Sequence, residues 1–350
     1  MIDHRYPPNC TYHPLTSDPV LSVIIVNWNT RDHLALCLES LRAGAPPYNF
    51  EVIVVDNCSA DGSVEFVRRE WPSVVLIAND RNKGFAGGVN DGLRTAKGTY
   101  LVVMNPDIQV HPRCLERLVE FAGAHPEAGA VMPAMYGADG RRQRDYVRLI
   151  PGLGQVVFFH TILEPAARRF PFLVRRFLEA YIPPGRDIAE VGQIPGAILL
   201  TRGEVVGRVG LMDEGFRLFY EDVDWSLRMK REGLKLLLTS NASVTHAGGG
   251  SFRGDFPVWQ TGRFVLSLMR FFDCHSSPVT SLAVKIILLA NSAGVVLVRS
   301  AGLALFGGGP SAKRSFSRAR HLHVLKLFYL VYVQKSDPGL FYGPGLGPVR

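Results

Sequence analysis

The segment Gly98–Asp107, with the sequence GTYLVVMNPD, decides the fold that we expect for this chain. Its β-branched and large apolar residues, bounded by glycine and proline, predict a buried strand. In an open α/β sheet ligands bind outside the carboxyl ends of the strands, so Asp107, just beyond this end, is a candidate for site chemistry. Taken alone, the last three residues are equally consistent with a simple turn. The rest of the chain favours the first interpretation.

Apolar runs and helical patterns alternate before this segment. The expected elements are strand 21–26, helix 31–41, strand 51–55, helix 63–70, strand 74–78 and helix 86–97. This alternation predicts an α/β fold with a doubly wound, mostly parallel sheet. A dehydrogenase is a weak alternative, because the glycine-rich stretch 82–88 lacks GxGxxG spacing and follows the third strand rather than the first.

The second half of the chain continues this pattern around one irregular segment. We expect helix 111–125, strand 130–133, strand 194–200, helix 202–209, helix 225–231 and strand 234–239. Within 141–190 arginines alternate with apolar groups, which is typical of amphipathic helices. This insertion either lies on a membrane surface or presents an ordinary solvated basic face.

Three acids, Glu221, Asp222 and Asp224, stand just before the helix expected at 225–231. The helix dipole favours negative charge at this end, and one acid would be enough for a cap. Three acids in four residues exceed what a cap needs. Farther on, 244–251 is expected to be a loop that contains His246, although a lone histidine is more often structural than a ligand.

Composition excludes some classes of function. The formal net charge of +8 and the isoelectric point near 9.4 indicate an anionic partner: a nucleotide, a phospholipid surface or a nucleic acid. The five cysteines are odd in number and lack CxxC spacing, which argues against a disulfide framework or a zinc site and fits a reducing cytoplasm. Residues 1–20 are expected to be coil and lack the apolar core of a secretion signal.

Residues 273–350 are expected to form a C-terminal helical extension. The stretch 279–306 is strongly apolar, but Lys285 and Arg299 limit its uncharged core to about thirteen residues, fewer than the ~20 of a spanning helix. An interfacial helix fits better, with the basic residues of 313–320 beside it for anionic lipid headgroups. The alternative is a helical pair packed on the rest of the protein or on a second subunit.

Four ordered motifs give the chain a resemblance to a known family. They are SVIIVNWN at 22–29, VVDN at 54–57 with Ser59 and Asp61, NKGFAGGVN at 82–90 leading to NPD at 105–107, and FYEDVD at 219–224 followed by His246. On these motifs the chain resembles the family 2 inverting glycosyltransferases of the GT-A fold, and among them the bacterial rhamnosyltransferase-like group. The resemblance runs from about Leu21 to Phe252 and implies a glycosyltransferase domain over 21–272.

The resemblance implies a site for a nucleotide-sugar donor. Asp56 would accept a hydrogen bond from the imide N–H of a uracil or thymine base, and Val26 and Trp28 would line the base pocket. Asn82 and Gly84 would border the nucleotide, where a glycine lets the backbone come close.

The resemblance also implies a divalent metal ion. Asp107 corresponds to the last acid of the family's DxD motif, which binds the ion that bridges the two phosphates. The first position of the motif is Asn105 here, so the pair offers one carboxylate and one amide. His246 matches a second protein ligand of some relatives. Oxygen ligands suit Mg²⁺, whereas an imidazole favours Mn²⁺.

The implied reaction is one in-line displacement at the anomeric carbon, in which a base deprotonates the acceptor hydroxyl. Asp222 matches the family's base, and Glu221 and Asp224 would position the acceptor or the helix. No nucleophilic side chain is required.

The expected function is transfer of a sugar, with rhamnose as the first choice, from a dTDP- or UDP-sugar to a polyprenyl-linked or polysaccharide acceptor. The enzyme would be cytoplasmic and peripheral on the inner face of the cell membrane, without a nucleic-acid partner and with a homo-oligomer left open. The alternatives are a non-catalytic scaffold protein of a glycan-assembly complex and a nucleotidyltransferase. The latter class usually has a basic, glycine-rich loop after the first strand, where this chain has Asn27–Thr30.

Overall fold

The computed structural model describes residues 19–143, 148–178, 187–216, 218–247 and 258–306. Its strands are β1 (Leu21–Asn27), β2 (Phe50–Asp56), β3 (Val75–Ala78), β4 (Tyr100–Met104), β5 (Ile108–Val110), β6 (Ala128–Tyr136), β7 (Ile188–Glu190), β8 (Ile198–Arg202) and β9 (Lys235–His246). Its helices are α1 (Arg31–Ala43), α2 (Ser63–Glu70), α3 (Gly84–Thr95), α4 (Cys114–Ala124), α5 (Leu153–Phe159), α6 (Glu164–Ala167), α7 (Pro171–Phe177), α8 (Gly203–Val209), α9 (Glu221–Arg231), α10 (Val258–His275) and α11 (Pro278–Phe306). The expected N-terminal coil up to residue 18 and the basic stretch 313–320 lie outside the described residues.

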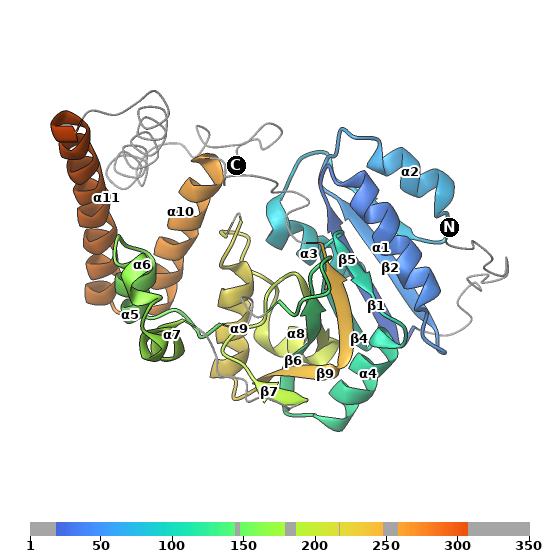
Figure 1. Ribbon diagram of the computed structural model, residues 1–350. Coiled ribbons are helices and arrows are strands. Elements are labelled where there is room, and N and C mark those ends of the chain that lie inside the picture. The colour runs from blue at the N-terminus through green and yellow to red at the C-terminus, as the bar shows by residue number, and fades with distance from the viewer. Residues whose placement is uncertain (1–18, 144–147, 179–186, 217, 248–257, 307–350) are drawn as a thin grey trace.

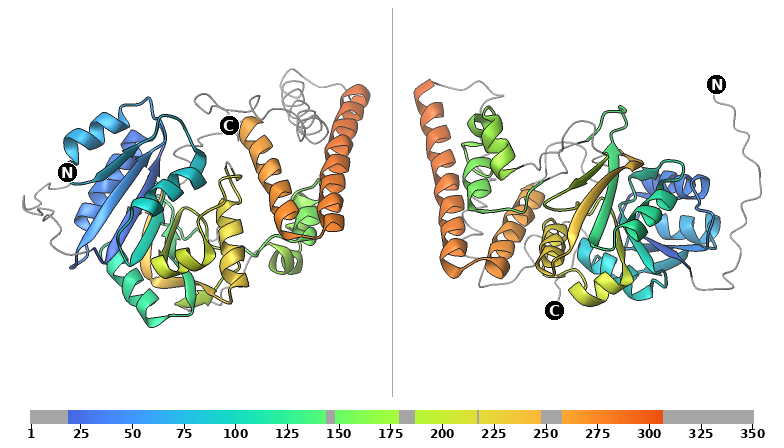
Figure 2. Two further views of the ribbon diagram at one scale, coloured as in Figure 1. Left: turned by 180° about the vertical axis from the view of Figure 1, so that it is seen from behind. Right: turned by 90° about the horizontal axis from the view of Figure 1, so that it is seen from below.

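The nine strands form one sheet in the order β3-β2-β1-β4-β8-β6-β9-β5, with β7 paired to β9 outside this path (Figure 1). From β3 to β4 all neighbours are parallel. Every residue of β1 is buried, including Ser22 and Asn27, as expected of a mainly apolar strand that is covered on both faces. The helices α1 and α4 lie on one face of the sheet, and α3, α8 and α9 lie on the other (Figure 2). The expected doubly wound α/β fold is confirmed.

The other half of the sheet is mixed. β8 runs antiparallel to both β4 and β6, and β5 and β7 run antiparallel to β9. The sequence does not predict β5 and β7, because three residues are too few to show a period. The prediction of a loop from residue 244 onward is wrong for residues 244–246. There β9 continues to His246, which pairs with Ile108. Similarly, α9 begins at Glu221 rather than at Trp225.

Two segments that are distant in sequence form what we call the helical lobe, which comprises α5–α7 and the antiparallel pair α10–α11 (Figures 1 and 2). Val156 of α5 belongs to the same buried cluster as Val284 and Leu288 of α11. The N–H of Ile162 also donates to Oδ1 of Asn291, at 2.7 Å. The expected insertion and the expected C-terminal extension therefore pack together, and α9 lies between them and the sheet.

The helix α11 covers the apolar stretch that the sequence singles out. By length and composition Pro278–Val295 could cross a membrane, and 28% of this window is buried inside the protein. Lys285 bonds to Asp273 of α10 at 2.7 Å, so this charge lies on the side of α11 that faces its partner helix.

Candidate active site

Polar side chains collect at one edge of the sheet, where β2, β4 and β9 end and β8 begins. Asp56 is the last residue of β2, Asp107 follows β4, and His246 is the last residue of β9. The N–H of Asn105 donates to the carbonyl of Ala197 at 2.8 Å, which joins the end of β4 to the start of β8. This edge is where an open α/β sheet binds its ligands. The structure thus brings together residues that the sequence predicts separately.

Asp56 is buried and held on both oxygens. Its Oδ2 accepts a hydrogen bond from Nδ2 of Asn27 and its Oδ1 accepts one from the N–H of Ser59, both at 2.8 Å. A carboxylate has about four lone-pair sites, so these two bonds fix its direction and leave acceptor capacity for a ligand N–H. The geometry is compatible with recognition of a base.

The residues expected to line the base pocket differ in exposure. Trp28 is half-buried just after β1. Val26 is buried, and a Cβ on Gly88 would lie 2.6 Å from its Cγ1, so α3 sits directly on it. Val26 therefore offers almost no surface to a ligand, whereas Trp28 offers part of its side chain.

The loop before α3 is fixed against the end of β2. Oδ1 of Asn82 accepts the N–H of Gly84 at 2.8 Å, and Gly84 has a φ of +77°, a conformation that suits glycine. Asn57 donates from Nδ2 to the carbonyl oxygen of Gly84, also at 2.8 Å. Asn82 thus fixes the conformation of this loop. Asn57, to which the sequence assigns no role, holds the loop against the end of β2.

Asp107 and His246 face each other. Nε2 of His246 lies 3.5 Å from Oδ2 of Asp107, and Nδ1 lies 3.0 Å from Oε1 of Gln143. An amide oxygen only accepts, so Nδ1 carries the proton and Nε2 points to the carboxylate. Gln143 also donates to the backbone carbonyl of His246 at 3.1 Å, which fixes the residue at a second point.

This pair fits a divalent cation. Oδ1 of Asp107 is buried without a hydrogen-bond partner among the described residues. Metal-bound histidines usually donate their other ring N–H to an oxygen, as His246 does to Gln143. Burial alone would raise the pKa of Asp107, but the hydrogen bond and charge of a protonated His246 outweigh it and lower the pKa, so the carboxylate is held in its ionised form. A cation bound between the two side chains would replace the proton on Nε2 of His246. Within the described part of the chain no group of three His, Cys, Asp or Glu residues forms a metal site.

Asp222 and Glu221 begin α9 with different surroundings. Oδ2 of Asp222 accepts the N–H of Gly196 at 2.8 Å, and its Oδ1 accepts the N–H of Val223 at 2.9 Å. Burial raises the pKa of Asp222, and these N–H groups and the charge of Arg148 offset part of the rise. Burial, followed by the charge of Asp222, raises the pKa of Glu221 to about 8.

The two acids differ in how well their charged forms are stabilised. Oε2 of Glu221 is buried without a partner in the described part of the protein, whereas both oxygens of Asp222 receive backbone N–H groups. Hydrogen bonds to a carboxylate stabilise its charged form. Burial favours the protonated form of Glu221, and its two backbone N–H partners make Asp222 the better candidate for the charged carboxylate of the pair.

Replacing Gly196 with alanine is expected to lower the turnover of the enzyme about tenfold without unfolding it. The new Cβ would lie 2.8 Å from Cε1 of Phe85 and 3.7 Å from Cβ of Asp222, so the backbone that holds Asp222 must shift. Steady-state kinetics of Gly196→Ala measure this. Gly207→Ala is the matched control, because nothing lies within 4 Å of its new Cβ. Unchanged turnover in both variants would contradict the role given to Gly196.

Sequence reasoning misses Gln143, and it points to the surroundings of Gly196 for the choice of sugar without predicting that Gly196 contacts Asp222. Gln143 lies in the segment that the sequence describes only as basic and amphipathic, 103 residues from His246. Gly196 precedes a strand and is placed next to Asp222 by the antiparallel course of β8. Asp224, by contrast, points away from this edge, to Arg228 and His275.

Comparison with known proteins gives a family for this arrangement. The profile of glycosyl transferase family 2 matches residues 22–179. An N-acetylglucosaminyl-diphospho-decaprenol L-rhamnosyltransferase of Mycobacterium tuberculosis is 30% identical over 241 residues, which cover 65% of this chain and 76% of that protein. The succinoglycan biosynthesis protein ExoO of Rhizobium meliloti is 33% identical over 175 residues, or 46% of this chain and 49% of that protein.

Among solved structures, a mannosyltransferase from Pyrobaculum calidifontis in complex with GDP-Man and Mn²⁺ aligns over 91% of this chain and 89% of its own. The TM-score is 0.54 and the sequence identity is 17%, which supports a shared fold. The order of the sheet, the position of the candidate site at its carboxyl edge and the relatives found by sequence are consistent with one family. The chain belongs to glycosyl transferase family 2, whose members characteristically invert the anomeric centre, and it is a glycosyltransferase.

Proposed function

We propose that the protein is a metal-dependent, inverting transferase that moves a sugar, with rhamnose as the first choice, from a dTDP- or UDP-sugar to a hydroxyl of a polyprenyl-linked or polysaccharide acceptor. The choice of sugar and acceptor rests on the mycobacterial relative, which by its name is a rhamnosyltransferase for a diphospho-decaprenol substrate. The residues of the site support the chemistry.

The observation that carries the proposal is the continuous set of contacts across the sheet edge. Asp107 follows β4, Asn105 bonds to Ala197, and the adjacent Gly196 bonds to Asp222. A group that binds diphosphate and a group that takes a proton are therefore linked through a short, rigid piece of backbone. Such positioning lets donor and acceptor meet in one geometry.

The chemical step follows from these positions. The carboxylate of Asp222 takes the proton of the acceptor hydroxyl, and the oxygen attacks the anomeric carbon on the face opposite the diphosphate. The anomeric C–O bond breaks, its electron pair leaves with the nucleoside diphosphate, and the configuration inverts. A carboxylate whose pKa lies above the ordinary value is a better base, and burial acts on Asp222 in this direction.

Asp107 and His246 would hold the divalent cation, Mg²⁺ or Mn²⁺, with the remaining ligands from diphosphate and water. When bound, such an ion neutralises charge on the leaving diphosphate. Asp107, Asn105 and His246 bind and orient this end of the donor.

Replacing Asp56 with asparagine is expected to weaken binding of dTDP or UDP about tenfold to a hundredfold. The amide that replaces one oxygen would present N–H to the imide N–H of the base, so an acceptor becomes a donor. Thermal stability against dTDP, UDP, GDP and ADP, each with Mn²⁺ or Mg²⁺, measures this, because a ligand at a hundred times its Kd stabilises by ~2.7 kcal/mol.

The control for this experiment is Asp139→Asn, an exposed acid of the loop after β6. A metal-dependent shift with dTDP or UDP in the wild type, reduced only in Asp56→Asn, would support the donor assignment. No shift with any nucleotide would refute it and favour the non-catalytic scaffold.

The helical lobe is proposed to hold the enzyme on an anionic membrane surface, on the cytoplasmic side. Most large apolar side chains that are exposed in the described part of the chain lie on this lobe: Leu153, Ile162, Leu163, Phe170, Phe172, Val279, Leu282 and Ile286. Arg168, Arg175 and Arg176 lie between or beside them on α6–α7. Apolar groups interspersed with arginine are typical of interfacial helices.

Serine at both Phe172 and Val279, which are 66% and 78% exposed, is expected to reduce sedimentation with anionic lipid vesicles at least tenfold. Serine at Leu36, an apolar residue 53% exposed on α1, is the control. Equal loss in the control, or full binding after both lobe substitutions, would contradict the proposed membrane surface.

A further inference from the structure

The turn that leads into Asp222 has an unfavourable backbone. Phe219 and Tyr220 both have a φ of +68°, the left-handed region in which bulky side chains are rare. Two consecutive residues of this kind persist only where the surroundings hold them in place. Because Tyr220 directly precedes α9, this turn sets the direction in which Glu221 and Asp222 leave the chain.

The aromatic side chains of the turn pack on α10. The ring of Phe264 lies 5.9 Å from that of Phe219 and 5.5 Å from that of Tyr220, measured between centroids. The ring of Phe271, two turns farther along α10, lies 5.6 Å from Tyr220. One face of α10 therefore covers both residues with positive φ.

Polar contacts from the same helix hold the chain just before the turn. Oγ of Ser267 donates to the carbonyl of Leu218 at 2.9 Å. Arg270 forms an ion pair with Asp213 at 2.7 Å, and a Cβ on Gly215 would lie only 2.1 Å from Cζ of Arg270. The segment that carries the turn is thus fastened to α10 on both its backbone and its side chains.

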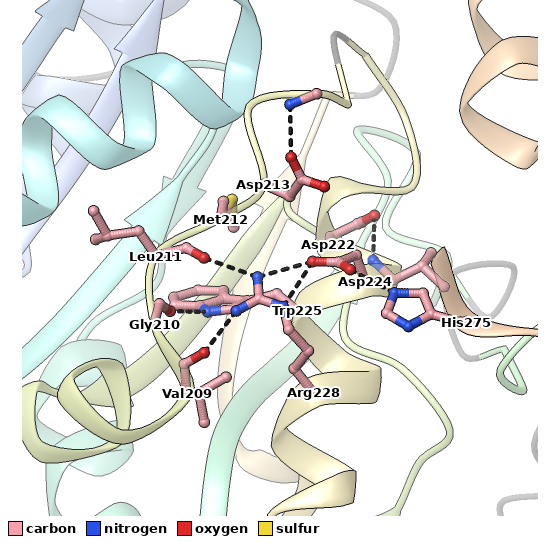
Figure 3. A network of polar contacts seen from close by, with 12 residues as sticks. Val209, Gly210, Leu211, Met212, Asp213, Asp222, Asp224, Trp225, Arg228 and His275 are labelled. Carbon is pink, nitrogen blue, oxygen red and sulfur yellow. Dashed lines mark hydrogen bonds and ion pairs between the residues drawn. The ribbon is translucent and has the colours of Figure 1, made fainter. Parts of the chain in front are cut away.

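The last residue of α10 holds the first turn of α9. Nε2 of His275 lies 2.6 Å from Oδ1 of Asp224, while Oδ2 of Asp224 accepts from Nε of Arg228 at 2.9 Å (Figure 3). The guanidinium of Arg231 lies 2.9 Å from Nδ1 of His275, and because it can only donate, Nδ1 is the acceptor and Nε2 carries the proton. His275 therefore donates a hydrogen bond to Asp224, two residues beyond Asp222.

We propose that α10 is the positioning element of the active site, in which Ser267 and His275 hold the turn at 219–220 and thereby keep Asp222 directed at the acceptor. These residues act through Asp222 and touch no substrate themselves. The inference rests on the proposed role of Asp222 as the base. It also gives the helical lobe a role in the site, because α10 packs on the turn that precedes α9.

The first test is amide hydrogen exchange over 219–225, where the N–H of Asp224 bonds to the carbonyl of Tyr220 at 2.8 Å. His275→Leu removes the donor to Asp224 and is expected to speed exchange in this peptide about tenfold. His275→Gln keeps a side-chain N–H and is expected to restore most of the protection. Cys274→Ser, an exposed neighbour on α10, is the control and should exchange like the wild type.

The second test is kinetic. His275→Leu is expected to lower turnover about tenfold with an unchanged Kd for dTDP or UDP, and His275→Gln is expected to recover turnover. Ser267→Ala is a smaller change that should also speed exchange and lower turnover. Its result decides between the outcomes if His275→Leu does not fold.

Unchanged exchange at 219–225 or unchanged turnover in His275→Leu would overturn the proposal. A loss of nucleotide binding as large as the loss of turnover would also overturn it, because it would indicate a merely structural role for His275. A wild type without transfer activity would refute the proposed function instead. Hydrogen exchange would still decide whether α10 holds the turn.

Discussion

Asp222→Asn is expected to lower sugar transfer by about 10²–10⁴-fold while dTDP or UDP binding changes less than about twofold. Asparagine has the same shape and its oxygen can still accept the N–H of Gly196, while its NH2 group gives up the bond from the N–H of Val223 within the same helix turn, so the link to Gly196 should stay in place. What is lost is the lone pair that takes the proton from the acceptor hydroxyl. Single-turnover transfer from a radiolabelled donor, together with calorimetric nucleotide binding, separates the two effects.

Two controls sharpen this experiment. Asp139→Asn makes the same chemical change at an exposed position and should leave transfer unchanged. Glu221→Gln keeps a neutral side chain where burial already holds a neutral acid at pH 7, so it should retain far more activity than Asp222→Asn. An equal loss of transfer and nucleotide binding in Asp222→Asn would argue against a base, and greater loss in Glu221→Gln would reverse the two assignments.

The second large effect is expected at the metal pair. Chelation of divalent cations should abolish transfer, and Mn²⁺ should restore it in the wild type. Asp107→Asn should raise the Mn²⁺ concentration needed for half-maximal activity about a hundredfold or more, because the buried oxygen without a partner would lose its charge. Gln143→Ala should raise it about tenfold to a hundredfold, since loss of a group that orients a metal ligand has this effect.

Thermal shifts with dTDP, measured with and without Mn²⁺, provide a readout that does not depend on turnover. Both variants should lose the Mn²⁺-dependent part of the shift and keep the part due to the nucleotide alone. His125→Gln replaces a histidine whose side chain is 29% exposed and distant from this pair in the chain, and it should behave like the wild type. A wild-type shift that is the same with and without Mn²⁺ would contradict the metal assignment.

The sequence by itself determined the class of fold, and it predicted which polar residues would lie at the carboxyl edge of the sheet. Apolar runs such as 23–26 and 100–104 are local signals, because a strand that is buried on both faces is composed mainly of apolar residues. Since parallel strands end at one edge, acids at strand ends such as Asp56 and Asp107 could be assigned to one site without coordinates.

Tertiary structure decided which distant segments meet. His246 lies at the end of a strand because β9 pairs with β5, and Gln143 holds its ring from 103 residues away. Gly196 reaches Asp222 because β8 runs antiparallel to β4. The insertion and α11 share one apolar cluster, and α10 holds the turn before α9. Periodicity reports which face of an element is apolar but not what covers it, so these contacts follow only from the packing of the whole chain.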